Sequence, residues 1–193
     1  ENGHIHQNVI NMIGCTEVSN NLFSNVAVYE QGRFTMRADE LSTTINNFSN
    51  GIHWTARDIW EQCLMYTKLY YYYHVLGNNP DFYPNLYRAL RNDRLDRRQG
   101  VTIRLKDESL KFVRYACDVA GEDLTEFFKV FGFFEIPQNN GYSLGYHKDD
   151  YGSFYIDTNP TTVSQDIEAT LNYIKSKNYK KNSSVIFNKK RFL

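Results

Sequence analysis

Hydrophobic residues recur every three or four positions over much of this chain, the spacing that places side chains on one face of an α-helix. In the N-terminal half the pattern predicts helices over residues 5–13, 16–29 and 56–76. Gly14 and Gly77 follow the first and the third of these, where glycine commonly ends a helix. The N-terminal half is therefore predicted to be almost entirely helical.

The same spacing continues in the C-terminal half. A helix is predicted around Leu86 and Leu90, with Leu95 as a further candidate for its apolar stripe. Other helices are predicted over residues 107–120, 124–131 and 159–179.

Capping residues support several of the predicted helix starts. Thr16 can cap the helix over 16–29, and Asp107 can cap the helix that follows it. Thr55 and Asp58 have the spacing of a capping box in front of the helix over 56–76. These signals place the predicted starts to within a few residues.

One segment departs from the helical pattern. Around residues 142–157, β-prone residues flank a polar turn, which predicts a β-hairpin or irregular strands. We therefore expect a mainly α fold with a small β element. We expect residues 1–135 to form a helical lobe, and residues 136–193 to add the β-containing segment and a final helix that packs on the same lobe.

Composition narrows the choice of partners. The 193 residues carry 22 basic and 22 acidic side chains, and this balance argues against a nucleic-acid partner, which would favour a basic excess. The longest apolar stretch is too short and too polar to be a transmembrane segment. Cys15, Cys63 and Cys117 do not form a disulfide framework, and buried free thiols are the favoured interpretation.

The opening residues, E-N-G-H, contain candidate chemistry. With one histidine in front of Glu1 they would match the zinc-peptidase motif H-E-x-x-H. Two histidines four positions apart share a helix face and can bind one ion, while the glutamate can accept a proton from the attacking water. His4 would then be the second ligand and Glu1 the general base.

Such a zinc site needs a third protein ligand, and Glu17 is well placed for it. Gly14 allows the chain to reverse between two antiparallel helices, which would bring Glu17 back toward His4. Glu17 lies on a polar face with Asn20 and Asn21. The opposite face of the same helix carries an apolar stripe, which is formed by Val18, Leu22, Val26 and Tyr29. The two asparagines could orient the glutamate by hydrogen bonding, although a polar face of this kind is often simply solvated.

Other residues are weaker candidates. His53 fits a structural or substrate-facing role in a loop, and His74 fits the core or a helix C-terminus better than a metal site. A peptidase also needs a donor for the oxyanion, and Arg57 and Tyr66 are weakly supported choices. Cys15 lies between the two ligand segments but fits a buried thiol better than a ligand.

The longer string E-N-G-H-I-H-Q, followed by G-C-T-E-V-S-N-N, resembles the enhancin-like zinc metallopeptidases (peptidase family M-sixty, the mucin-active group that includes viral enhancins). In that family H-E-x-G-H-x-x-Q precedes a glutamate in a T-E-V-x-N-N context. The resemblance covers about the first 135 residues. The matching positions in this chain are Glu1, Gly3, His4, Gln7, Thr16, Glu17, Val18, Asn20 and Asn21.

The resemblance implies a gluzincin-type site, with His4 and Glu17 as zinc ligands and Glu1 as the catalytic base. The fold it implies is the helical C-terminal lobe of such a peptidase. The first histidine ligand and the N-terminal lobe would precede Glu1, so we expect the chain to be an inactive fragment of a longer peptidase.

The resemblance also implies zinc as the cofactor, a mucin-like glycoprotein as the substrate and a secreted or cell-surface location. We expect a monomer. A different class of protein stays open as an alternative, in which E-x-x-H is incidental: a non-catalytic helical module that binds a glycan or a protein.

Overall fold

The computed structural model describes residues 10, 12–13, 15–33, 51–93, 102–139, 141–143 and 153–182. The α-helices are α2 (Thr16–Glu30), α4 (Ile59–Tyr70), α5 (Phe82–Asn92), α6 (Ser109–Ala120), α7 (Thr125–Val130) and α9 (Pro160–Ser176). Shorter helical turns are η2 (Trp54–Ala56), η3 (Tyr71–Val75) and η4 (Leu105–Asp107). The strands are β1 (Thr102–Ile103), β2 (Glu122–Asp123), β3 (Gly141–Ser143), β4 (Ser153–Ile156) and β5 (Lys180–Lys181).

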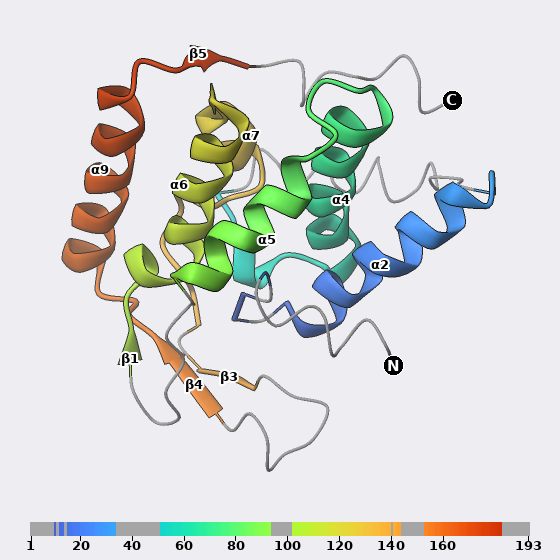
Figure 1. Cartoon of the computed structure of the whole chain (residues 1–193). Helices are drawn as coiled ribbons and strands as arrows, with labels where there is room; N and C mark the ends of the chain where they lie inside the picture. Colours follow the sequence, from blue (N-terminus) through green and yellow to red (C-terminus); the bar gives the residue numbers. More distant parts are fainter. Residues whose placement is uncertain are drawn as a thin grey trace.

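The helices stand side by side around one aromatic core (Figure 1). Helix α2 packs against α4, α5 packs against α6, and α6 packs against α9. The largest fully buried side chains of this core are mostly aromatic, and they include Trp54, Tyr66, Phe112, Phe128 and Phe133. Because aromatic rings bury a large apolar area each, this core accounts for much of the high aromatic content of the sequence.

A small sheet lies at one end of the helices (Figure 1). Its strand order is β1-β4-β3, with β1 parallel and β3 antiparallel to β4. A second apolar cluster beside the sheet includes Ile103, Leu110, Ile156 and Val163, and it joins the sheet to α6 and α9. Strands β2 and β5 form a separate parallel pair at the other end of α6.

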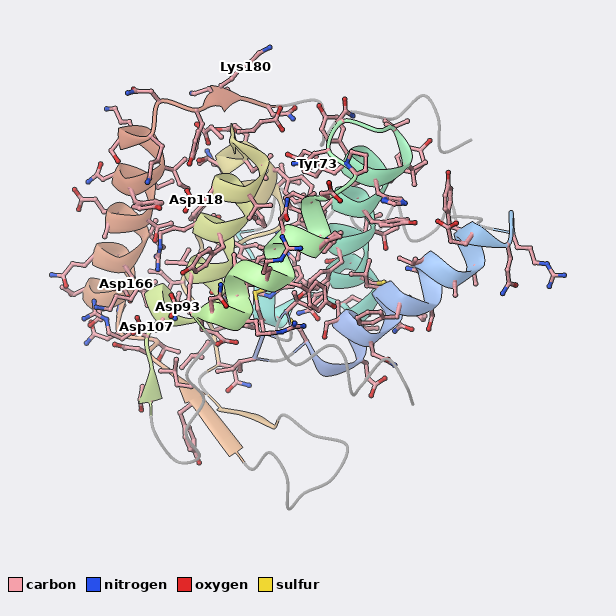
Figure 2. The ribbon with its side chains drawn as sticks, viewed as in Figure 1. Tyr73, Asp93, Asp107, Asp118, Asp166 and Lys180 are labelled. Atoms are coloured by element: carbon pink, nitrogen blue, oxygen red, sulfur yellow. The ribbon has the colours of Figure 1, made fainter. Side chains whose placement is uncertain are left out.

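Polar contacts fasten α9 to α6 (Figure 2). The carboxylate of Asp118 on α6 accepts hydrogen bonds from Tyr173 at 2.7 Å and from Tyr179 at 3.0 Å. The buried carboxylate of Asp166 on α9 pairs with Arg104, which lies just before η4. Hydrogen bonds to charged groups are stronger than those between neutral groups. These contacts therefore help to fix the orientation of α9, in addition to the apolar packing.

Most predicted elements are confirmed. Helix α2 spans 16–30, α9 spans 160–176 behind its Asn159 cap, and the β segment forms the β3–β4 hairpin. The parallel addition of β1 to this hairpin was not predicted. The predicted helix over 5–13 lies mostly outside the described residues, but Ile10, Met12 and Ile13 at its end are not helical.

Three of the predicted capping residues are wrong, and the helices concerned begin one to three residues from the predicted starts. The long helix begins at Ile59 rather than at 56, because Asp58 accepts a hydrogen bond from the Trp60 amide at 2.8 Å. Thr55 lies in η2 and does not cap α4. Glu108 takes the cap position of α6 in place of Asp107, which lies in η4, and Thr16 is the first residue of α2 rather than its cap.

Among the described residues, none of the helices has the length and apolar character needed to cross a membrane.

Candidate metal-binding helix

The segment in front of α2 is held in place by two hydrogen bonds from distant parts of the chain. The Tyr66 hydroxyl on α4 donates to the Ile10 carbonyl at 2.8 Å, and the Ile13 amide donates to the Glu108 carboxylate at 2.8 Å. The side chains of Ile10, Ile13 and Cys15 are buried, as are those of Tyr66 and Glu108. The start of α2 is therefore fixed against both α4 and α6.

Helix α2 is amphipathic, and its buried face is the apolar stripe predicted from the sequence. Val18 and Leu22 are buried, and Val26 and Tyr29 pack partly buried against the same core. The predicted stripe is thus confirmed, and it turns the opposite face of α2 outward.

A polar contact along the seam with α4 supports the apolar stripe. The Asn25 side-chain amide donates to the Thr67 hydroxyl at 3.0 Å and to the Cys63 sulfur at 3.3 Å. Both acceptors lie on α4, where they are buried. These contacts fix the rotation of α2 about its axis, and with it the direction in which the outer face points.

Glu17 lies on this outer face. It is exposed, in the first turn of α2, where the helix dipole favours a negative charge. Asn20 and Asn21 are half-buried one turn further on. No hydrogen bond of their side chains with another described residue is found, so their predicted role in orienting Glu17 stays a prediction.

The other two candidate residues, Glu1 and His4, lie outside the described residues. Within the described part of the chain, no group of three or more histidine, cysteine, aspartate or glutamate side chains could hold a metal ion. Glu17 offers a solvent-accessible carboxylate on a fixed helix, and this donor suits zinc. The described residues therefore fit the role of one zinc ligand and of its support.

Neither weak candidate for the oxyanion donor fits the structure. Tyr66 is fully buried and its hydroxyl is used by the Ile10 carbonyl. Arg57 is buried beside Glu61, with 3.7 Å between the guanidinium and the carboxylate.

His53 and the three cysteines have structural surroundings. Burial, together with the positive charge of Arg57, lowers the pKa of His53 to about 3, so its ring is neutral at physiological pH. Its Nδ1 atom accepts from the Thr55 amide at 3.3 Å, which makes its role structural. The prediction of buried free thiols is confirmed for all three cysteines.

Sequence reasoning did not find the role of Glu108. Glu108 stands at the start of α6, a position where a carboxylate is usually solvated and interacts with the helix dipole. Its hydrogen-bonding partner Ile13 lies 95 positions away. No local pattern could have connected the two residues.

The chain as a whole can be compared with known proteins. The profile of peptidase M60, enhancin and enhancin-like, matches residues 1–132, and the chain belongs to this family. No curated protein matches the chain in sequence.

Two solved structures are similar to the chain. One is a metallopeptidase in complex with Tn antigen, with 27% identity and a TM-score of 0.76, where the match covers 94% of this chain and 32% of the other. The second is a metallopeptidase from Bacteroides thetaiotaomicron, with 28% identity and a TM-score of 0.73 over 93% of this chain and 29% of the other. The chain thus spans about a third of the length of these metallopeptidases.

Proposed function

We propose that this chain supplies part of the catalytic site of a zinc metallopeptidase, with Glu17 and His4 as zinc ligands and Glu1 as the general base. The observation that carries the proposal is the match of the M60 family over residues 1–132, which contains all three residues. The E-x-x-H spacing and the downstream glutamate supply the donor types that such a site uses.

The surroundings of α2 support the role of Glu17. Tight metal binding favours a ligand whose backbone is held in position before the metal arrives, because less conformational freedom is then lost on binding. Helix α2 meets this requirement through the anchors at Ile10 and Ile13 and through the Asn25 contacts with α4. Glu17 itself stays exposed, where it can reach a metal ion.

The chemistry assigned to this site is hydrolysis of a peptide bond. Zinc, when bound, would polarise the peptide carbonyl and lower the pKa of the attacking water. The Glu1 carboxylate would accept a proton from that water as its oxygen forms a bond to the carbonyl carbon. The same proton would then pass to the nitrogen of the leaving amine as the carbon–nitrogen bond breaks.

The proposed substrate class is a heavily glycosylated, mucin-like protein. One structural neighbour is a metallopeptidase in complex with Tn antigen, and this supports a glycoprotein substrate. An enzyme with such a substrate would act outside the cell or at its surface, and we propose this location for the protein that contains this chain.

Two substitutions in the full-length protein test the two roles separately. Glu1→Gln should abolish cleavage of a mucin-type glycoprotein while zinc stays bound, because an amide cannot accept the proton and the base is not a ligand. Glu17→Ala should lose zinc and cleavage together, because it removes a ligand. Zinc content is measured by elemental analysis after dialysis, and cleavage is measured by gel electrophoresis.

Glu126→Gln is the matched control, since Glu126 is an exposed carboxylate on α7 and is expected to leave both readouts unchanged. Normal turnover of Glu1→Gln would contradict the base assignment. Full zinc content in Glu17→Ala would contradict the ligand assignment, and cleavage that survives a chelator would contradict the whole mechanism.

A further inference from the structure

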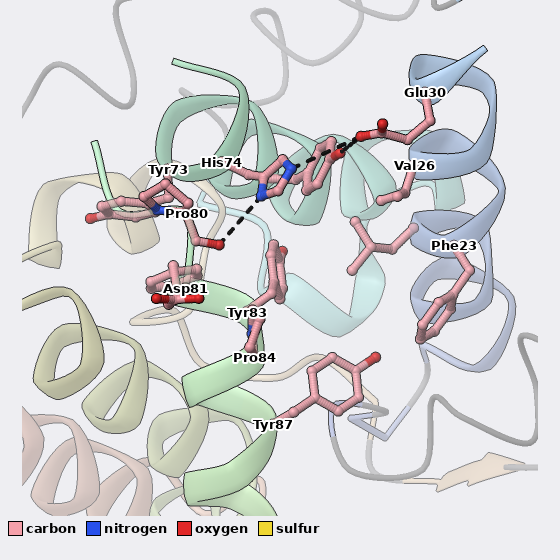
Figure 3. Close-up of a pocket in the computed structure, with 13 residues that line it drawn as sticks. Phe23, Val26, Glu30, Tyr73, His74, Pro80, Asp81, Tyr83, Pro84 and Tyr87 are labelled. Carbon is pink, nitrogen blue, oxygen red and sulfur yellow. Dashed lines mark hydrogen bonds and ion pairs between the residues drawn. The ribbon is translucent and has the colours of Figure 1, made fainter. Parts of the chain in front are cut away.

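A pocket of about 500 Å³ lies between α2, the end of α4 with η3, and α5 (Figure 3). The α2 residues that line it start at Leu22, and neither Glu17 nor its two asparagine neighbours lines it. Its size falls in the range of small-molecule binding sites. The pocket is therefore separate from the proposed metal-binding face.

Aromatic rings form much of the pocket wall. Phe23 on α2 meets Tyr87 on α5 edge to face, with 6.2 Å between the ring centroids. Tyr70 stacks on His74 at 5.0 Å on the opposite side, and Tyr83 lies between these two pairs (Figure 3). Aromatic faces carry a negative electrostatic potential, so a wall of this kind attracts cations as well as apolar groups.

The helix widens where it meets the pocket. The five residues of η3 form a π-helical turn, in which the Leu76 amide donates to the Tyr71 carbonyl at 3.0 Å. Tyr73 and His74 of this turn line the pocket. Such turns occur frequently at functional sites, because they redirect side chains that a regular helix would point elsewhere.

The charged residues of the pocket lining are acidic. Glu30 and Asp81 lie on opposite sides of the pocket, and the lining contains no lysine or arginine (Figure 3). The Tyr70 hydroxyl donates to Glu30 at 3.1 Å, and the His74 Nε2 atom lies 3.9 Å from the same carboxylate. Asp81 is exposed and makes no capping hydrogen bond to α5 in the described part of the chain, so a ligand can reach its carboxylate.

A hydroxyl group inside the pocket is also available. Among the described residues, the buried Tyr87 hydroxyl has no hydrogen-bond partner. Burial raises the pKa of Tyr87, so the hydroxyl keeps its proton at neutral pH and can donate. A buried polar group without a partner is destabilising, and a ligand that supplies the missing partner would gain that hydrogen bond.

From this combination we propose that the pocket binds an organic cation, namely an ammonium or quaternary ammonium group on an apolar body. The rings provide cation–π contacts, the two carboxylates provide charge complementarity, and Tyr87 provides a hydrogen bond for a polar atom at the other end of the ligand. The proposal does not depend on the peptidase activity, because no pocket residue belongs to the proposed zinc site.

Choline and its neutral isostere 3,3-dimethylbutan-1-ol are the probes that test the proposal. The two molecules have nearly the same shape, and only choline is charged. Isothermal titration calorimetry of the full-length protein should show saturable binding of choline, with the isostere weaker by about tenfold or more, as expected for a partly desolvated cation–π site. Added salt should weaken choline binding by screening the carboxylates.

Three variants locate the binding site. Glu30→Gln and Tyr70→Leu should each weaken choline binding several-fold, and Glu126→Gln, which removes a carboxylate outside the pocket, should leave it unchanged. A thermal melt of each variant confirms that it is folded. The proposal is overturned if choline does not bind, if the isostere binds equally well, or if the folded Glu30 and Tyr70 variants bind choline like the wild type.

Discussion

Replacing Tyr66 with phenylalanine tests whether the start of α2 is anchored as the structure indicates. The substitution keeps the ring in the core and removes only the hydroxyl, whose hydrogen bond to the Ile10 carbonyl is 2.8 Å long. Both residues are fully buried, so the carbonyl would be left in an apolar environment without this partner. We expect a loss of about 1–3 kcal/mol in the free energy of unfolding, the usual cost of an unsatisfied buried polar group.

Tyr83→Phe is a matched control. It removes a hydroxyl that donates to the Tyr66 carbonyl at 2.7 Å, and Tyr83 is also buried. Its acceptor lies within α4, where the helical amide four residues on also bonds to it, so the expected loss is only about 0.5–1.5 kcal/mol. Urea unfolding followed by circular dichroism measures both variants.

Tyr66→Phe should also weaken zinc binding by the full-length protein, because it loosens the helix that carries Glu17. Tyr83→Phe should not have this effect. The reasoning is refuted if Tyr66→Phe unfolds at the wild-type urea concentration, or if Tyr83→Phe costs more stability than Tyr66→Phe.

Two further predictions concern Gly132 and His53. Gly132→Ala should destabilise the fold by about 1–3 kcal/mol more than Gly121→Ala in urea unfolding, because both glycines have positive φ but only at Gly132 would a Cβ overlap the Ile52 carbonyl oxygen; equal losses would refute the steric argument. The lowered pKa of His53 means that the unfolded state binds more protons between pH 6.5 and about 3, so stability should rise with pH in this window. The slope approaches about 1.4 kcal/mol per pH unit, and His53→Gln should flatten the pH profile of the urea midpoint, whereas the exposed His74→Gln should not.

The helical elements could be predicted from the sequence because each depends on local spacing. The stripe of α2, the glycine after α6 and the Asn159–Pro160 start of α9 are all encoded within a few residues of the element that they define. The predicted starts of α4 and α6 were off by up to three residues because several neighbouring polar residues could serve as caps. In α4 the capping residue is Asp58, which follows η2 and lies directly in front of the helix.

The support of the candidate site could not be predicted in the same way. Tyr66 and Glu108 contact residues 56 and 95 positions away, and neither has a local signature that distinguishes it from an ordinary aromatic or helix-start residue. The parallel pairing of β1 with β4 is likewise a long-range contact between very short strands. A motif marks Glu17 as a candidate ligand, whereas the residues that hold its helix in place have no motif.

The proposed zinc ligand and the residues that anchor its helix should respond differently to mutation. Glu17 is exposed and contributes little to the apolar core, so replacing it should affect metal binding more than folding. The anchors Tyr66 and Glu108 are not proposed as ligands, yet a metal site tolerates only small displacements of its donors. Substitutions at Tyr66 and Glu108 should therefore couple a loss of stability to a loss of metal affinity. A scan that measured activity alone would assign Tyr66 and Glu108 to the catalytic site. Measurement of unfolding in parallel would separate these positioning residues from the proposed ligand.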